Sequence, residues 1–379
     1  MTLSYSKPDM NKKFEQITTV LARSLGLETE QFLNAFQRAT AADFEAICAL
    51  RRLGFGREGE MDEKILSWRY FDSSKQCSDI YVLKYHGKVI AAVGAEPIQV
   101  ELGGALVEGV RTADIVVHPD HLKRGIGGWM NLFMQHHYRV VMAMGANENS
   151  SSMVRRVFKP MNCRRHFKLL LSCKSYLLRR GIPGLAAQLV DGLVWQSYRF
   201  LLSSKLRRFS GEFTVDTHAS VSSLALYFQQ PGAEGWTKKG VRRDFDFCHW
   251  RFELNPKSDF QCIVVSNVAG PLAYAIVKTD SNNSGDYYLM DWSIVREYKN
   301  IQHWKCLLAE VVAAVKSAGG RSIAVLASDE LSVSGLCQST FSERAKDDAF
   351  YLYADQSLGE EVLNENAWYI TYADTDEML

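Results

Sequence analysis

The chain has 379 residues, of which 47% are hydrophobic and 23% charged, and 44 Lys and Arg against 43 Asp and Glu leave a formal net charge of +1. This is the composition of a soluble globular protein, and it excludes general disorder and a chain that is basic throughout. At roughly 150 residues per domain, the length predicts two or three domains. The first residues contain no apolar run of signal-peptide length, so we expect a cytoplasmic location.

The cysteines are scattered singly, without a Cys-x-x-Cys pair or the mixed Cys and His spacing that zinc needs. We interpret them as reduced thiols in or near cores, and we expect no metal cofactor. They are Cys48, Cys77, Cys163, Cys173, Cys248, Cys262, Cys306 and Cys337.

Apolar residues three to four positions apart predict one amphipathic helix within residues 1–35, an N-terminal extension packed on a larger body. Residues 39–43 look like the end of a first strand and a helix cap that begins a second helix, and a third helix is expected at 62–70. Glycine turns then separate three expected strands, at 80–85, 89–102 and 106–117.

The most informative pattern follows, because a strand, a basic glycine-rich loop and an apolar helix come in direct succession from Ala113 to Met134. Amides exposed at a helix start, together with the positive end of the helix dipole, bind anions, and glycines let the backbone approach a phosphate closely. A Walker loop needs Gly-Lys followed by Ser or Thr, whereas here Trp129 follows Gly128. A dinucleotide-binding fold needs the loop after the first strand, and here it follows the fourth. The loop reads Lys123-Arg124-Gly125-Ile126-Gly127-Gly128.

An internal repeat indicates two lobes. Trp68-Arg69-Tyr70, followed by two strands, recurs 182 residues later as Trp250-Arg251-Phe252, again followed by two strands. The order of the later elements also agrees, and a duplication explains this better than chance. The remaining elements expected in the second unit are strands at 287–295, 323–327 and 350–353 and a helix at 301–318.

The Val-x-Pro at 117–119 and the Gly-x-Gly at 125–127, after this order of strands and helices, resemble the GNAT (GCN5-related N-acetyltransferase) superfamily. The resemblance covers residues 38–173. It implies an α/β fold class, a mixed α+β sheet, with two tandem GNAT-like acyl-CoA N-acyltransferase lobes, each a mixed sheet flanked by helices. The expected division is an extension at 1–35, a CoA-binding GNAT domain at 36–174, a basic amphipathic linker helix at 175–210 and a degenerate second GNAT-like domain at 211–379.

The resemblance further implies that acetyl-CoA, or another acyl-CoA, is the co-substrate. Its pantetheine arm would pair with the backbone of the fourth strand, and its diphosphate would meet the amides of the glycine loop. Leu122 stands where the family has Arg or Gln, with cations beside it to supply charge. The implied cofactor-binding residues are Val116, Val117, Lys123, Arg124, Gly125, Ile126, Gly127 and Gly128, with Asn149 and Ser150 after a fifth strand expected at 140–144, where a helix cap is an equally good interpretation.

The chemistry needs few further groups, because an acyl thioester is already activated and a positioned neutral amine can attack it directly. A base takes up the amine's proton. Asp114 is the first candidate, Glu108 the second, because strand alternation places it on the same face, and Glu96 the third. The family's general acid is a tyrosine whose position holds Phe158, so the thiolate leaves unaided, Tyr138 substitutes, or acyl-CoA binds without turnover.

The linker allows two interpretations, since residues 175–209 carry six Lys and Arg against the single acid Asp191. In the favoured one, a helix at 182–202 connects the lobes and packs through Leu185, Leu189, Leu193 and Trp195. In the other, residues 182–208 make peripheral contact with an anionic membrane surface. Polar residues interrupt the apolar run, so a membrane span is not expected.

The second unit looks degenerate, because no glycine occurs at 294–304, where its long helix should open. We expect its cofactor site to be lost and the lobe to form one wall of the acceptor cleft. The tail after Tyr353 holds seven acids and no Lys or Arg, which we interpret as a solvated edge.

The leading functional hypothesis is an acyl-CoA-dependent N-acyltransferase, acetyl by default, that acts on a small-molecule primary amine. One alternative is a CoA-binding or scaffold protein without turnover. A second is an aminoacyl or peptidyl transferase, which predicts a basic groove for RNA, whereas the basic residues here cluster in the linker. We therefore expect no nucleic acid partner. The sequence leaves the acceptor, the acyl length and the oligomeric state open.

Overall fold

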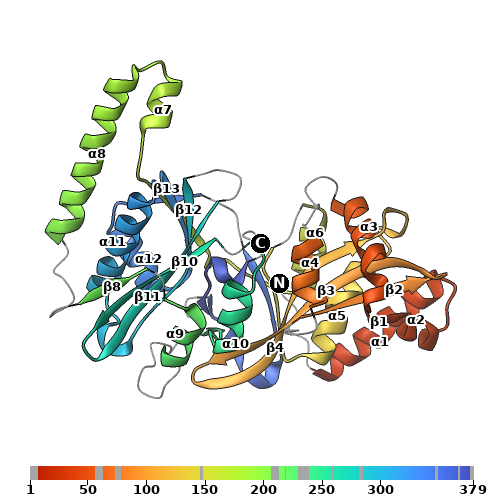
Figure 1. Cartoon of the computed structure of the whole chain (residues 1–379). Helices are drawn as coiled ribbons and strands as arrows, with labels where there is room; N and C mark the ends of the chain where they lie inside the picture. The colour runs from red at the N-terminus through yellow and green to blue at the C-terminus, as the bar shows by residue number, and fades with distance from the viewer. Residues whose placement is uncertain are drawn as a thin grey trace.

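The protein is described by a computed structural model that covers residues 7–55, 63–72, 78–145, 148–205, 213–217, 219–228, 239–257, 259–280, 285–345, 349–365 and 368–375. Two lobes lie side by side, each a mixed sheet flanked by helices (Figure 1). The expected α/β fold class with two lobes is confirmed.

The N-terminal extension forms two helices rather than the single one expected, α1 (Lys7–Ser24) and α2 (Thr29–Ala35). The chain turns between them at Gly26, whose φ of +68° favours glycine. α1 packs on α5 (Ile126–His137), where the Phe14 ring stacks on Trp129 and Thr18 accepts a hydrogen bond from the Trp129 indole at 2.8 Å. The extension is thus part of the first lobe's core.

The first sheet carries the elements expected between residues 36 and 145. β3 pairs antiparallel with β2 and β4, whereas β4 and β5 are parallel and α5 connects them. The other helices of this lobe are α3 (Phe44–Phe55), α4 (Glu63–Tyr70) and α6 (Glu148–Val157). The strand order is β1 (Phe36–Arg38), β2 (Asp79–Tyr85), β3 (Lys88–Leu102), β4 (Ala105–Val117), β5 (Val140–Ala143), β15 (Phe350–Ala354) and β6 (Lys159–Met161), and β9 (Lys239–Val241) joins β3 to the side of this path.

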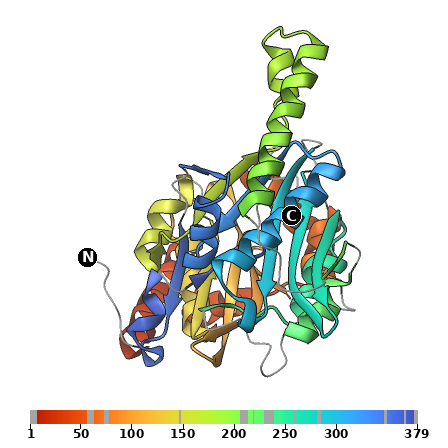
Figure 2. The same cartoon turned by 90° about the vertical axis from the view of Figure 1, so that its left-hand side faces the viewer.

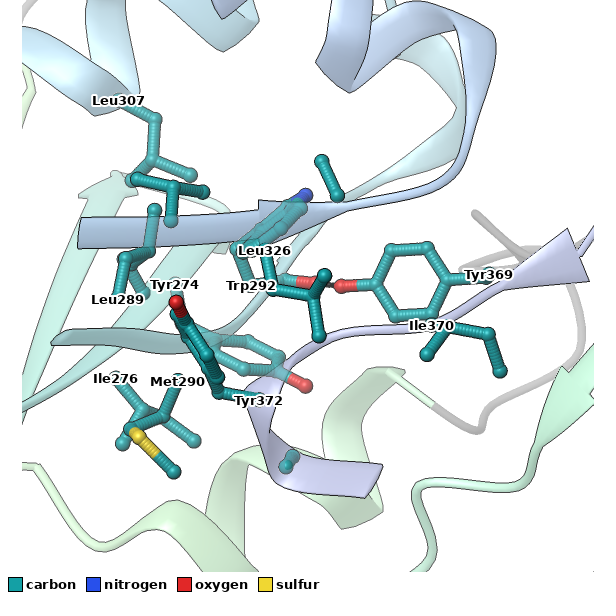
Figure 3. Packing of buried hydrophobic residues seen from close by; sticks show 14 of the residues in the cluster. Tyr274, Ile276, Leu289, Met290, Trp292, Leu307, Leu326, Tyr369, Ile370 and Tyr372 are labelled. Carbon is teal, nitrogen blue, oxygen red and sulfur yellow. Dashed lines mark hydrogen bonds between the residues drawn. The ribbon is translucent and has the colours of Figure 1, made fainter. Parts of the chain in front are cut away.

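The second sheet repeats this arrangement. β11 pairs antiparallel with β10 and β12, β12 and β13 are parallel, and α11 (Ile301–Ser317) connects them. Apolar side chains of α11 and the sheet, Leu307 and Leu289 among them, form a common core (Figure 3). The strand order is β14 (Ser342–Arg344), β7 (Arg165–Leu170), β13 (Ser322–Ala327), β12 (Asp286–Ile294), β11 (Gly270–Thr279), β10 (Phe260–Asn267) and β8 (Thr214–Asp216), accompanied by α9 (Val221–Phe228), α10 (Phe245–Cys248) and α12 (Glu330–Cys337).

Strands from each half of the chain lie in the sheet of the other half, β7 and β15 among them. β7 belongs to the first half of the chain, yet it lies between β14 and β13 of the second sheet. β15 belongs to the second half and lies between β5 and β6 of the first sheet. The two sheets therefore do not correspond to separate stretches of the chain before residue 174 and after residue 211. The expected domain limits stay a prediction.

The repeated Trp-Arg motif lies where the lobes meet. The Trp68 and Trp250 rings stack with centroids 4.8 Å apart and planes at 14°, and Ile65 and Leu254 pack against them. Two equivalent residues that face each other make a self-complementary contact, as at the axis of a two-fold dimer. This contact, together with the shared strand pairing, supports the interpretation of the chain as a duplication.

The linker is an arm, defined here as α7 (Lys174–Arg179) and α8 (Gly184–Lys205), which projects from the second lobe (Figures 1 and 2). Trp195 packs on the body as expected. Leu185, Leu189 and Leu193 are 82%, 71% and 64% exposed, so the expectation that they pack between the lobes is wrong. The reason is that α8 contacts the body along one side only, and these leucines lie on the other.

The C-terminal segment, residues 368–375, runs through the interior between the lobes. It begins with β16 (Trp368–Tyr369), which pairs with β9, and all of its residues are buried. Asp374 is 0% exposed and accepts two hydrogen bonds from Arg243, at 2.7 and 2.8 Å. The expectation that the acids of the tail form a solvated edge is wrong for Asp374, because a buried arginine binds it, and for Asp355, which is 7% exposed and accepts a hydrogen bond from the Ser357 amide.

Candidate functional site

The first lobe has a strand opening at one end of β4. β4 pairs with β5 only from Gly109 to Thr112. Beyond this point β4 continues to Val117, and within the described ranges residues 113–117 pair with β3 alone. One edge of this backbone is thus available to an extended ligand.

A β-bulge shapes this opening. The pairing of β3 with β4 shifts register between Ala92 and Gly94, opposite Asp114. Asp114 has a φ of +53°, which non-glycine residues adopt rarely. Bulges bend a strand and redirect its side chains, so the bulge turns the end of β4 away from the direction of β5.

The glycine loop lies beside the opening. Gly125 precedes α5 with a φ of +90°, a conformation that favours glycine, and no side chain caps the helix there. A Cβ atom added at Gly127 would lie 3.8 Å from the side chains of Ile115 and Val117 and 3.7 Å from Met153. The uncapped start of α5 therefore faces the part of β4 that does not pair with β5. An anionic, extended ligand requires both features, free amides for its charge and a free strand edge for its chain.

The structure brings together most of the residues that the resemblance implied. Lys123 and Arg124 are exposed at the loop, and Gly127 and Gly128 open α5 next to Val117. Ile126 and Val116 are buried, so these two residues can offer backbone only. Asn149 and Ser150 lie in the first turn of α6, and their side chains are outside the described part of the structure.

Asp114 is the centre of a buried ion-pair network. Arg51 contacts its Oδ1 at 2.7 Å, and Arg69 donates to its Oδ2 at 3.1 Å. The Tyr70 hydroxyl donates to the same Oδ2 at 2.7 Å. With cations bound at both oxygens, this carboxylate is arranged to hold the bulge in place.

Glu96, the third candidate base, is part of the same network. It is 2% exposed and accepts hydrogen bonds from Arg69 and Arg111. Arg111 also donates to the backbone carbonyl of Asp374, so the network joins the first lobe to the C-terminal segment. Both oxygens of Glu96 are bound by arginine, which again favours a positioning role.

Glu108 lies apart from this network. In the register of β3 and β4, Glu108 is opposite Gln99, whereas Arg111 is opposite Glu96. Residues three apart on a strand point to opposite faces, so Glu108 faces away from Arg111. Asp114 reaches the Arg111 face because the bulge interrupts the alternation, and the expectation that Glu108 and Asp114 share one face is wrong.

Neither Phe158, which stands at the position of the family's acid, nor Tyr138, the possible substitute, is placed to protonate a thiolate. Phe158 is 2% exposed and belongs to the core. Tyr138 follows the C-terminal end of α5, a 12-residue helix that is about 18 Å long, and so lies far from Gly125. Burial raises the pKa of Tyr138, with a further contribution from Tyr81. The geometry disfavours the substitution of Tyr138 for the missing tyrosine.

Sequence reasoning missed the partners of Asp114, which are Arg51, Arg69 and Tyr70. The signal was present, because Arg69 and Tyr70 stand in the repeated Trp-Arg motif and Arg69 is 0% exposed. An arginine that recurs beside a core tryptophan indicates a buried cation, and a buried cation needs an acid. Gly94 adds to the fit, because any Cβ there would collide with the Tyr70 hydroxyl.

The second lobe has the corresponding opening, but the C-terminal segment fills it. β12 pairs with β13 up to Leu289 and continues to Ile294. Tyr369 donates to the Trp292 carbonyl at 2.7 Å (Figure 3). Ser328, the residue after β13, donates to the Trp368 carbonyl at 2.7 Å. A cavity beside the segment is lined in part by Trp292, Trp304, Asp329 and Tyr369, and we interpret it as the remainder of this opening.

The helix start in the second lobe is also occupied. Asn300 precedes α11, and its side chain accepts hydrogen bonds from the amides of Gln302 and His303, both at 3.0 Å. A capped helix start has fewer free amides for an anion. The second lobe therefore lacks both parts of the site that the first lobe has.

Comparison with known proteins agrees with this division. Residues 35–147 match the family model of the acetyltransferase (GNAT) domain, which spans β1 to the end of β5. Over these residues the first lobe is thus similar to a GNAT domain, and the chain has a two-lobed mixed α/β fold like that of GNAT-like acyltransferases. A search of curated protein sequences found no match.

Solved structures resemble the chain over most of its length. A protein of Enterococcus faecalis V583 described as a probable N-acyltransferase is 11% identical, with a TM-score of 0.55 over 85% of this chain and 73% of that one. N-myristoyltransferase of Saccharomyces cerevisiae with bound myristoyl-CoA is 11% identical, with a TM-score of 0.52 over 84% and 79%. A GCN5-related N-acetyltransferase of Kribbella flavida is 13% identical, with a TM-score of 0.53 over 84% and 70%. At such identities the likeness shows the fold.

Proposed function

We propose that the protein transfers the acyl group of an acyl-CoA, acetyl-CoA by default, to the primary amine of a small molecule. The first lobe binds the donor. The diphosphate meets the amides of Gly127 and Gly128 with Lys123 and Arg124 beside it, and the pantetheine arm extends along the backbone of Val116 and Val117. Among the described residues no cluster of His, Cys, Asp and Glu could hold a metal ion, and the proposed transfer requires none.

One observation carries the proposal: the uncapped start of α5 faces the stretch of β4 that has left β5. An anion and an extended chain that can form backbone hydrogen bonds must come together in one ligand to use both features. CoA is such a ligand, since its diphosphate is joined to an amide-containing arm. The GNAT family match and the likeness to a myristoyl-CoA complex support this identification.

The reaction then follows from positioning. The neutral amine attacks the thioester carbonyl, the C–N bond forms, the C–S bond breaks, and CoA leaves as a thiolate. Backbone N–H groups near the bulge stabilise the oxyanion, and water takes up the proton of the amine and protonates the thiolate. We propose that Asp114 holds the bulge and its arginines, because it already pairs with Arg51 and accepts hydrogen bonds from Arg69 and Tyr70.

Calorimetry with CoA tests the donor site. Gly127→Val places methyl groups between α5 and the side chains of Ile115 and Val117, and we expect it to weaken CoA binding at least about a hundredfold. The matched control is Gln302→Val, the second residue of α11, which we expect to leave binding unchanged. Equal binding by Gly127→Val and the wild type would contradict the donor site.

Turnover needs a separate test, because binding without catalysis is the second candidate. The burial of Phe158 favours that candidate, since no tyrosine acid occupies its position. Release of free thiol from acetyl-CoA and from longer acyl-CoAs, measured over a panel of amino sugars, polyamines and amino acids, distinguishes the two. Thiol release that depends on the amine supports the transferase, whereas tight CoA binding with no release from any pair supports the scaffold.

A further inference from the structure

The arm is attached to the second lobe by one side of its base. Asp191 accepts hydrogen bonds from the backbone amides of Cys173 and Lys174 at 2.6 and 3.2 Å, and its carboxylate lies 3.9 Å from the Lys316 ammonium. Lys316 also lies over the Trp195 ring, 5.4 Å from its centroid. These contacts fix an inner side, and the rest of the arm projects away from the body (Figures 1 and 2).

The outer side of the arm is apolar. Leu185, Leu189 and Leu193 follow one another at four-residue spacing on α8 and are 82%, 71% and 64% exposed. α7 adds Tyr176 and Leu178, at 59% and 45%. Soluble proteins rarely expose a contiguous apolar surface of this kind without a partner. The surface therefore indicates that something covers it.

The charge around this surface has one sign. Between Ser172 and Val190 the sequence contains Lys174, Arg179 and Arg180 and no Asp or Glu. Both arginines are exposed in the turn region that joins α7 to α8. The first acid reached, Asp191, is turned toward the body by the contacts above. An apolar helical face accompanied by cations alone complements an anionic, apolar phase.

We propose that the arm binds anionic lipid bilayers. Leu185, Leu189 and the apolar residues of α7 enter the boundary between headgroups and acyl chains, and Arg179 and Arg180 contact lipid phosphates. Fluid lipids can surround a projecting, convex surface. A rigid protein partner can cover such a surface only if it carries a matching groove. A second copy of the arm is a poorer occupant, because it brings cations together with no acid opposite them. No described helix is long and apolar enough to cross a membrane, so the contact is peripheral.

Flotation of the full chain with vesicles tests this proposal. We expect binding to vesicles of phosphatidylcholine mixed with phosphatidylglycerol and much weaker binding to phosphatidylcholine alone. Leu185→Ser combined with Leu189→Ser should weaken binding about a hundredfold, since two buried leucines are lost. Arg179→Gln combined with Arg180→Gln should weaken binding to the anionic vesicles roughly thirtyfold, at about fivefold for each cation.

Val268→Ser is the matched control, because Val268 is more exposed than these leucines, at 101%, but lies in the turn between β10 and β11. It should bind vesicles like the wild type. All variants should keep their circular dichroism spectrum and their CoA affinity, since the replaced side chains project from the body. The proposal is overturned if the wild type does not float with anionic vesicles, or if the leucine variant floats equally well. It is also overturned if sedimentation shows a dimer that the leucine variant dissociates while vesicles capture neither protein.

Discussion

The two lobes have the same strand pairing around the same opening, and they differ in what can enter it. In the first lobe the helix start at Gly125 is uncapped and the end of β4 has left β5. In the second lobe Asn300 caps α11 and the C-terminal segment crosses the end of β12. Under the proposed function, one copy of the duplicated fold keeps a ligand site, whereas the opening of the other copy is a structural joint held by the C-terminal segment.

A difference in charge between equivalent residues of the two lobes explains how the C-terminal segment is held in the second lobe. Glu96 in β3 and Lys278 in β11 stand at the same place, both by the 182-residue repeat and by the register of the strands. Glu96 accepts from Arg69, whereas Arg251, the repeat of Arg69, donates to the carbonyl of Thr375. The C-terminal segment therefore supplies an acceptor to the arginine of the lobe that lacks the acid.

Replacing the acid of the first lobe has the largest expected effect. Glu96→Gln leaves Arg69 and Arg111 without a carboxylate that both now contact, and all three side chains are nearly inaccessible. Breaking a buried pair in this way costs about 3–5 kcal/mol of unfolding free energy. The measurement is denaturant unfolding of the purified protein.

The control for this variant is Glu343→Gln, which removes an exposed ion pair with Arg165 and should cost less than about 1 kcal/mol. Similar costs for the two variants would mean that the network of the first lobe contributes no more than a surface pair. The proposed contrast between the lobes would then be lost.

Replacing Lys278, at the equivalent position of the second lobe, is expected to raise the free energy of unfolding, whereas replacing Glu96 lowers it. Burial, with the charges of Arg251 and Lys257, lowers the pKa of Lys278 to about 8 from 10.5. The unfolded state therefore binds more protons between pH 8 and 10.5, and stability rises with pH in this window. Lys278→Met should stabilise the protein by about 2 kcal/mol at pH 7, after allowance for solvent screening, and should flatten the dependence.

Unfolding of the wild type and Lys278→Met from neutral to alkaline pH checks this prediction. The gain in unfolding free energy should shrink as the pH passes through the window, because the wild-type lysine loses its charge. A destabilised variant at pH 7 would show that the ammonium is bound favourably, as Glu96 is in the first lobe.

The contact between the repeated tryptophans should give a smaller, pairwise effect. Trp68→Leu and Trp250→Leu each remove one ring of the stack. A stacked pair contributes about 0.5–1.5 kcal/mol beyond the area it buries. A double-mutant cycle on unfolding free energies should return a coupling of this size, whereas strictly additive costs would mean that the rings are neighbours without mutual stabilisation.

Local patterns were sufficient to predict the elements of the first lobe. The strand expected at 89–102 is β3 (Lys88–Leu102), and the one at 140–144 is β5 (Val140–Ala143). The exchange of β7 and β15 was not predictable, because their sequences suit any buried strand and the choice of sheet depends on contacts far apart in the chain. The helix at 182–202 was expected correctly, but its exposed leucines show that periodicity does not reveal which side is covered.

The geometry of the candidate site was predictable where it depends on the backbone and unpredictable where it depends on packing. Glycines at 125 and 127 before an apolar helix indicate an anion site from the sequence alone. The role of Asp114 depends on a bulge that strand alternation cannot show, and on arginines from α3 and α4. The blocked opening of the second lobe depends on a segment about 80 residues further along the chain, which no local pattern connects to β12.

The last prediction separates the two features that close the second lobe. Asn300→Ala removes the acceptor for the amides of Gln302 and His303 and should cost about 1 kcal/mol. We nevertheless expect no CoA binding there, because Thr371 bonds to Asp291 at 2.9 Å and Tyr369 bonds to Trp292, so the segment still fills the opening. Calorimetry is done on the combined variant Gly127→Val and Asn300→Ala. Because we expect little CoA binding by the first lobe of this variant, heat from the second lobe can be measured. Heat from CoA binding in the combined variant would show that the cap rather than the C-terminal segment keeps the second lobe empty, and the duplicated site would then be dormant instead of lost.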